Sequence, residues 1–160
     1  MKRHPALIPL SQDHHKALLL AQLIKRNAPE YQGLPKELIG KMNFAKEIYH
    51  KELEHHFRDE EQFVFPYLKG KDDKLDNLIS NILNEHIILK EKILSLVDNP
   101  NLVGHLDEIG NILGEHVRKE ERILFEKAQT ILSEDELKII ENKFAESRPN
   151  NKSCITNKLN

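Results

Sequence analysis

Residues 54–65 read Glu-His-His-Phe-Arg-Asp-Glu-Glu-Gln-Phe-Val-Phe, and residues 114–125 read Gly-Glu-His-Val-Arg-Lys-Glu-Glu-Arg-Ile-Leu-Phe. Both stretches contain a His followed four residues later by a Glu: His56 with Glu60, and His116 with Glu120. Residues four apart in a helix lie on one face, a turn apart. Each stretch therefore predicts a helix face that offers an imidazole and a carboxylate, and two such faces could hold a pair of metal ions.

The composition indicates a single domain without nucleic-acid or membrane partners. The chain has 160 residues, enough to bury a core, and its 24 basic and 26 acidic residues nearly balance. It shows no apolar run as long as a membrane span, and Met1 to Leu10 lacks the apolar region of a signal peptide. The lone Cys154 excludes an intramolecular disulfide framework and cysteine-rich metal sites. We therefore expect a cytoplasmic protein, while its oligomeric state is not defined by the sequence.

Apolar residues at helical spacing predict four long helices and a short fifth one. The expected ranges are about 12–27, 35–68, 73–97, from Asn99-Pro100 to about 128, and a short helix after residue 133. Ser11 and Asp72 are predicted N-caps of the first and third helices, and Ser133 with Glu136 forms a capping box for the fifth. Pro66 predicts a kink or an early end of the second helix.

No strand pattern is present, so the predicted fold class is all-α. We expect an antiparallel up-down-up-down four-helix bundle with a short additional C-terminal helix, over residues 1–148. Residues 149–160 are rich in Asn, Lys and Ser and are predicted to form a disordered polar tail. C-terminal to the two His and Glu pairs, the apolar stripes predict that Phe63 and Tyr67 on the second helix, and Ile123 and Leu124 on the fourth, face inward.

Each long helix also carries a histidine on or beside its apolar stripe. The candidate metal ligands are His14, His56, Glu60, His86, His116 and Glu120. On the first helix His15 is an alternative, but it would bring Gln22 onto the inward face, so His14 is favoured. Because the stripes of an antiparallel bundle face one axis, these four imidazoles and two carboxylates can converge.

This ligand set suits two divalent ions. Imidazole binds iron, zinc, copper or nickel, and carboxylates can bridge two ions and neutralise charge that would be costly to bury. Iron is favoured because mixed nitrogen and oxygen ligands leave positions for a small molecule, whereas structural zinc prefers closed tetrahedral sites. Few basic residues lie on the inner stripes to pair with Glu60 and Glu120. Glu61 and Glu121 are expected to form surface ion pairs with basic side chains, and remain possible ligands if the register slips.

These residues resemble the hemerythrin-like, or HHE cation-binding, family. The resemblance covers about Pro9 to Ala128 and rests on Asp13-His14-His15, His56 to Glu61, Glu85-His86, and His116 to Glu121. It implies a four-helix bundle around a non-haem di-iron site. Glu60 and Glu120 would bridge the two iron ions, and His14, His56, His86 and His116 would complete the ligand set.

The chain departs from the oxygen-carrying members of that family at two positions. Lys90 stands where those proteins have a second histidine on the third helix. On the fourth helix those proteins have an Asp five residues after the histidine, whereas this chain has Glu120, four residues after His116. The greater carboxylate character should stabilise oxidised iron.

Three functions follow as hypotheses. The first is a di-iron protein that binds or senses a small diatomic ligand, dioxygen or nitric oxide, or that handles iron. The alternatives are a di-iron enzyme acting on peroxide or nitric oxide, and a metal-free helical interaction module. The sequence identifies no catalytic acid or base, so it leaves open whether the protein is an enzyme.

Overall fold

A computed structural model describes residues 1–149, and every regular element in that range is helical. The elements are η1 (Pro5–Leu7), α1 (Ile8–Leu23), α2 (Leu38–Ile48), η2 (Tyr49–Leu53), α3 (Glu54–Asp59), η3 (Glu60–Val64), α4 (Phe65–Leu68), α5 (Asp73–Leu94), α6 (Leu102–Lys119), η4 (Glu120–Leu124), α7 (Phe125–Ile131) and α8 (Glu134–Ser147). The all-α prediction is confirmed for these residues. The predicted polar tail, apart from Pro149, lies outside the described residues, as does Cys154.

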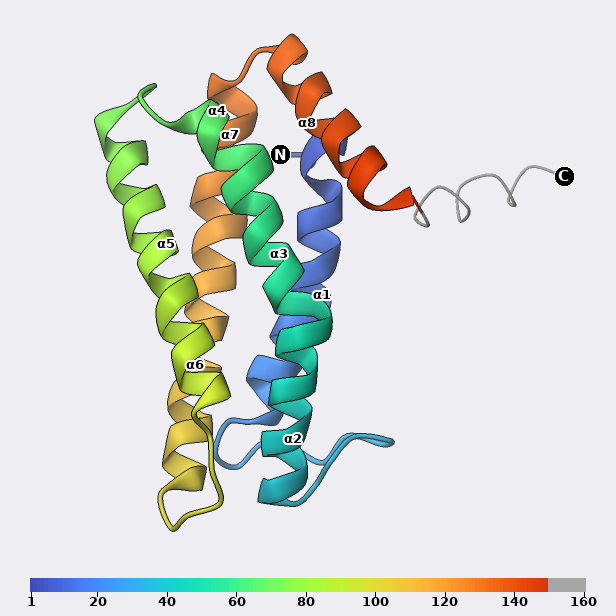
Figure 1. Ribbon diagram of the computed structural model, residues 1–160, viewed down its shortest axis with the longest axis vertical. Coiled ribbons are helices and arrows are strands. Elements are labelled where there is room, and N and C mark those ends of the chain that lie inside the picture. Colours follow the sequence, from blue (N-terminus) through green and yellow to red (C-terminus); the bar gives the residue numbers. More distant parts are fainter. Residues whose placement is uncertain (150–160) are drawn as a thin grey trace, which may run out of the picture.

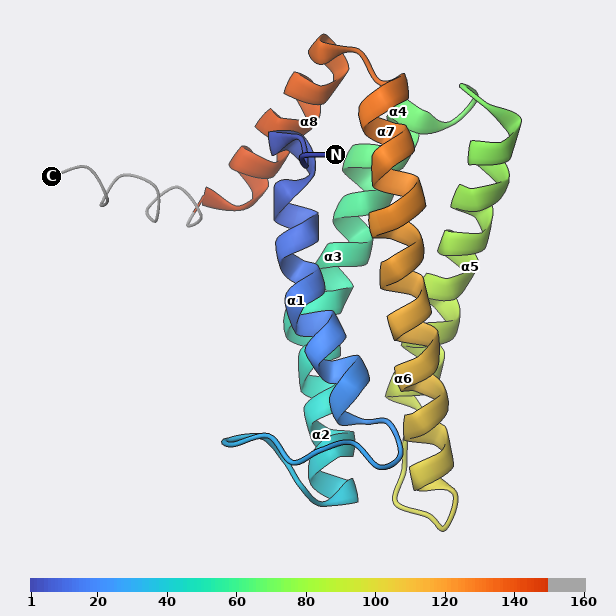
Figure 2. The same cartoon turned by 180° about the vertical axis from the view of Figure 1, so that it is seen from behind.

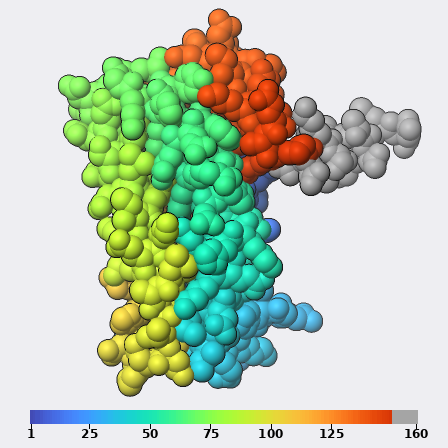
Figure 3. Space-filling model, viewed as in Figure 1, coloured from blue at the N-terminus to red at the C-terminus, as the bar shows by residue number. Residues whose placement is uncertain are grey.

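The long helical segments lie side by side along the molecule. In Figures 1 and 2, α1, the continuous run from α2 to α4, α5, and the run from α6 to α7 share one long axis. Helix α1 contacts both α2 and α6, and α5 also contacts α6. Helix α8 packs against η1 and η3 at one end, and Figure 3 shows its residues adjoining those of α3 and α4 on the surface. No helix among the described residues is both long enough and apolar enough to cross a membrane.

The interior consists of two apolar clusters with a polar layer between them. One cluster includes Leu20 of α1 and Leu113 of α6, and the other includes Leu10 of α1 and Phe125 of α7. Each long helix passes from one cluster to the other, and its buried histidine lies between them. Buried polar groups in such a layer are costly unless they find partners within it.

The helix starts agree only partly with the sequence. Asp72 caps α5 by accepting a hydrogen bond from the backbone N–H of Leu75, and the capping box at the start of α8 is present. The N-cap prediction for Ser11 is wrong, because α1 already begins at Ile8 after the turn η1, which leaves Ser11 inside the helix. The second long helix ends at Leu68, two residues after Pro66.

Two π-helical turns start at the glutamates of the repeated element. In η3 the backbone N–H of Phe65 donates to the carbonyl of Glu60, and in η4 that of Phe125 donates to Glu120. A π turn inserts one residue into the helix and rotates the face that follows. For this reason the prediction that Ile123 faces inward is wrong: its side chain is 45% exposed, although Leu124 is buried as expected.

The same rotation explains why the predicted inward positions of the helix that ends at Leu68 are also wrong. Phe63 and Tyr67 are only partly buried, whereas Val64, Phe65 and Leu68 are fully inside. The inward positions move one residue along the chain because the spacing after Glu60 is no longer that of an α-helix.

Candidate metal centre

The polar layer brings together all six residues that the sequence singled out. They come from six elements and are at most 4% exposed: His14 (α1), His56 (α3), Glu60 (η3), His86 (α5), His116 (α6) and Glu120 (η4). His15, the alternative on α1, is exposed. The helical spacing of the repeat thus places its His and Glu on one buried face, as the sequence predicted.

These residues form two groups that share both carboxylates. The first ligand group is His14, His56, Glu60 and Glu120, and the second ligand group is Glu60, His86, His116 and Glu120. In each group, one ligand atom from every residue lies within 4.8 Å of the others. Such a pair of sites with two common carboxylates can accept two cations.

The ε nitrogens of all four imidazoles face the two carboxylates. In the first group, His14 Nε2 lies 3.0 Å from Glu120 Oε2 and 3.1 Å from His56 Nε2. In the second group, His86 Nε2 lies 3.3 Å from Glu60 Oε2, and His116 Nε2 lies 3.1 Å from Glu120 Oε1. The nitrogen lone pairs and the carboxylate oxygens therefore converge on the same space.

The δ nitrogen of each imidazole is held by a second carboxylate, and we call these four residues the outer carboxylates. The pairs are His14 with Glu121 at 2.7 Å, His56 with Asp13 at 3.0 Å, His86 with Glu61 at 2.8 Å, and His116 with Glu85 at 2.8 Å. A carboxylate that accepts from Nδ1–H fixes the tautomer and the ring orientation, and leaves Nε2 free for a metal.

Three of the outer carboxylates also contact a cationic side chain. Glu121 Oε2 lies 2.7 Å from Arg3 Nη2, and Asp13 Oδ2 lies 3.0 Å from Arg148 Nη2. Glu85 pairs with Lys119. The predicted ion pair of Glu121 with a basic side chain is therefore present, whereas Glu61 pairs with His86 instead. Sequence reasoning assigned no role to Asp13 and Glu85, although each directly precedes a candidate ligand.

Several buried polar atoms at the centre have no hydrogen-bond partner among the described residues. They are both carboxylate oxygens of Glu60, Oε1 of Glu120, and Nε2 of His86 and His116. The contact of His116 Nε2 with Glu120 Oε1 is short but lacks hydrogen-bond geometry. Unpartnered buried carboxylate oxygens are costly, and divalent cations would satisfy them together with the imidazoles. The donor set therefore fits metal ions.

The pKa values of two imidazoles of the centre are raised, and that of one outer carboxylate is lowered. Burial lowers the pKa of His56, but the neighbouring carboxylates outweigh it and raise this pKa to about 10. The same balance raises the pKa of His86 to about 11. Burial raises the pKa of Glu121, but its hydrogen bond with His14 and further polar contacts lower it to about 2. Without metal, the protonated rings of His56 and His86 supply positive charge beside the buried carboxylates.

Aromatic rings cover the imidazoles from both apolar clusters. Phe57 stacks on His86 with a centroid distance of 4.0 Å, and Phe65 lies nearly parallel to the same ring at 6.2 Å. Phe125 stacks on His14 at 5.6 Å with an interplanar angle of 5°. These contacts restrict rotation of the rings and keep water away from them.

One pocket opens beside the second ligand group. It has a volume of about 250 Å³, and its lining includes His86, Phe57, Glu61, Tyr49 and Lys90. This pocket provides a path from the surface to an imidazole of the centre. Lys90, one turn after His86 on α5, stands on this path rather than among the ligand atoms.

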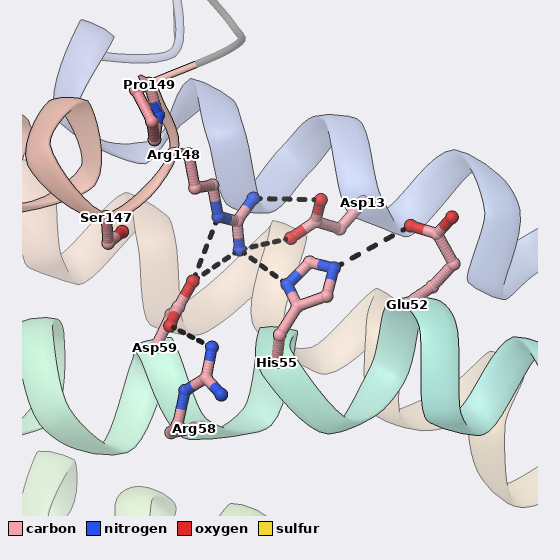
Figure 4. A pocket seen from close by; sticks show the side chains of 8 residues that line it. All are labelled: Asp13, Glu52, His55, Arg58, Asp59, Ser147, Arg148 and Pro149. Carbon is pink, nitrogen blue, oxygen red and sulfur yellow. Dashed lines mark hydrogen bonds and ion pairs between the residues drawn. The ribbon is translucent and has the colours of Figure 1, made fainter.

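A third cluster of candidate ligand atoms lies nearer the surface. It consists of Asp13, Glu52 and His55, in a pocket of about 390 Å³ that Figure 4 shows. Cationic side chains already pair with it, since Arg148 contacts Asp13 and Lys16 contacts Glu52. We therefore assign no ion to this cluster.

In a comparison with protein families, residues 9–128 match the model of the hemerythrin HHE cation binding domain. The chain belongs to this family. Comparisons with curated proteins and with solved structures give no match. The match confirms the resemblance that the sequence motifs suggested. In this hemerythrin domain, all six candidate ligands lie within the matched residues, whereas Arg3 and the whole of α8 lie outside them.

Proposed function

We propose that this hemerythrin-family protein holds two iron ions, one in each ligand group, with Glu60 and Glu120 shared between them. We further propose that it uses this centre to bind or sense a small diatomic ligand such as dioxygen or nitric oxide, or to handle iron. The observation that carries the proposal is the set of unpartnered carboxylate oxygens and imidazole nitrogens facing one another in the interior.

The number of ligands in each group is compatible with iron that also binds a small molecule. Each group offers two imidazole nitrogens and shares the two carboxylates, which is fewer protein ligands than six-coordinate iron accepts. Bound iron would supply redox chemistry and a position for a small molecule. The residues of the chain orient the four imidazoles through the outer carboxylates, exclude water with the stacked phenylalanines, and leave the pocket beside His86 as an approach.

The proposed domain is an antiparallel up-down-up-down four-helix bundle over residues 1–148, with α8 as the additional helix. The path of the chain supports this topology. In Figure 1 the connections before α2 and before α6 lie at one end of the molecule, and the connection before α5 lies at the other. Such a bundle lets side chains from facing helices build a metal site in its core.

Metal analysis of reconstituted protein tests the proposal. Metal-free protein is incubated with ferrous iron without air, freed of unbound iron, and analysed for iron content and optical spectrum before and after exposure to dioxygen or nitric oxide. We expect about two irons per chain, one for each ligand group, and a spectral change on addition of the diatomic ligand.

Matched histidine variants separate the buried site from unspecific binding. The double variant His56→Ala/His116→Ala removes one imidazole from each ligand group and should abolish iron loading. The control variant His15→Ala/His105→Ala removes two exposed imidazoles and should load like the wild type. Wild-type protein that retains no iron, with an unchanged melting temperature after chelation, would favour the metal-free interaction module and end the proposal.

A further inference from the structure

Arg148 connects the C-terminal helix with the interior of the bundle. It follows the last residue of α8, outside the residues matched by the family model, and its side chain is only 14% exposed. Figure 4 shows its guanidinium between α1 and α3, pointing toward Asp13, Asp59 and His55. This arginine is therefore placed to act on the bundle rather than on α8 alone.

The guanidinium holds the carboxylate of Asp13 at both oxygens. Nη1 donates to Asp13 Oδ1 at 3.1 Å, and Nη2 lies 3.0 Å from Oδ2. A two-point contact of this kind fixes the orientation of a carboxylate as well as its position. Asp13 Oδ2 is also the atom that lies 3.0 Å from His56 Nδ1. The orientation that Arg148 imposes on Asp13 is thus the one that His56 requires.

Arg148 also removes a charge conflict beside the centre. Asp59 is 1% exposed, and its Oδ2 accepts hydrogen bonds from Arg148 Nε at 2.9 Å and from Nη2 at 2.7 Å. The same Nη2 donates to His55 Nδ1 at 3.1 Å. Arg58 Nη2 reaches only the other oxygen of Asp59, Oδ1, at 3.5 Å. Without the guanidinium of Arg148, Asp59 Oδ2 would lose both of these donors and Asp13 would lose its two-point contact, so Asp13 would gain by turning toward solvent.

We propose that Arg148 is a positioning residue of the metal centre. It acts through Asp13 on His56, and so couples the packing of α8 to the metal affinity of the first ligand group. This inference rests on the proposed metal centre. It adds that a helix outside the matched family domain contributes to that centre.

A double-mutant cycle with cobalt(II) tests the inference, because cobalt(II) is a spectroscopic probe for imidazole-rich sites. Cobalt(II) affinity is measured by optical titration for wild type, Arg148→Ala, Asp13→Ala and the double variant. Loss of a carboxylate that orients a histidine ligand typically weakens metal binding about 10–100-fold, and Arg148→Ala should cost about 10-fold. In the Asp13→Ala background, Arg148→Ala should cost nothing further, because the residue through which it acts is gone.

A local readout distinguishes positioning from a general loss of stability. The Nδ1–H proton of an imidazole bound to cobalt(II) gives a paramagnetically shifted signal in NMR spectra. We expect the His56 signal, identified by its absence in His56→Ala, to exchange with solvent faster in Arg148→Ala, while the signals of His86 and His116 keep their rates. Lys138→Ala is the matched control, since it removes an exposed cation from the same helix α8 that pairs with Glu141.

The outcomes separate the inference from the proposed function. Wild-type protein that binds no cobalt(II) would refute the metal centre and the inference with it. Binding by the wild type with equal affinity in Arg148→Ala, or an equal effect of Arg148→Ala with and without Asp13, would overturn the inference alone. If Arg148→Ala does not fold, Arg148→Lys replaces it in the same cycle, because it keeps the charge and a long side chain over Phe144 but lacks the planar fork.

Discussion

Filling the centre with two divalent ions should release at least two protons per chain at pH 7. In the metal-free protein the pKa of His56 is about 10 and that of His86 is about 11, because the carboxylates around them outweigh the effect of burial. At pH 7 both rings therefore carry a proton on each nitrogen. The Nδ1 protons stay with the outer carboxylates, whereas the Nε2 protons must leave before these nitrogens can bind a metal.

The number of protons released follows from the positions of the ligands. His56 belongs to the first ligand group and His86 to the second, so each ion displaces at least one proton. The pKa of His14 is raised in the same sense, since its bonds to Glu120 and Glu121 outweigh burial. The two ions bring four positive charges into the polar layer, so the displaced protons partly balance that charge.

Titration with zinc in weakly buffered solution measures this release. Zinc avoids oxidation during the experiment, and a pH-indicator dye reports the protons, while metal analysis gives the number of ions bound. The variant His56→Ala should release about one proton fewer, whereas His105→Ala, which changes an exposed ring, should release as many as the wild type. Two bound ions with fewer than two protons released would refute the charge balance described for the metal-free centre.

Two further predictions concern stability. The pKa values of His56 and His86 are raised above the unfolded value of about 6.5, so their contribution is complete below pH 6.5 and is lost as the pH rises through about 10. The melting temperature of the metal-free protein should therefore fall over that range, and a constant value in calorimetry would contradict the assignment. Gly110 allows close approach of α1 and α6, because a Cβ atom there would lie 2.7 Å from the carbonyl oxygen of Ala21. Gly110→Ala should lower the free energy of unfolding, measured in urea melts, by about 1–3 kcal/mol. At Gly114 the nearest atoms to a Cβ lie at 3.7 Å, so Gly114→Ala should raise the free energy of unfolding by about 0.5–1 kcal/mol. Equal effects of the two substitutions would refute the packing argument.

The inward ligands could be predicted because their pattern is local to each helix. His56 and Glu60 lie four residues apart on one helix, and the antiparallel arrangement expected of the bundle brings the four faces together. The outer carboxylates could not be predicted in this way. Asp13 reaches His56 on another helix, and that contact depends on the rotation and spacing of two packed helices. Arg148 lies still further away in the sequence, at the end of a helix that the family match does not include.

Each copy of the repeat contributes more to the centre than its His and Glu ligands, because its π turn places further side chains against a histidine of another helix. A π turn of five residues brings the Phe that directly follows it close to the Glu at its start, on the inward side of the helix. In the first copy, Glu61 holds Nδ1 of His86, and Phe65 stacks on the same ring. The second copy makes both contacts with His14, at the equivalent positions. Each copy therefore supplies a His and a Glu from its own helix and also orients a histidine of a neighbouring helix, so a change in either π turn should disturb both ligand groups.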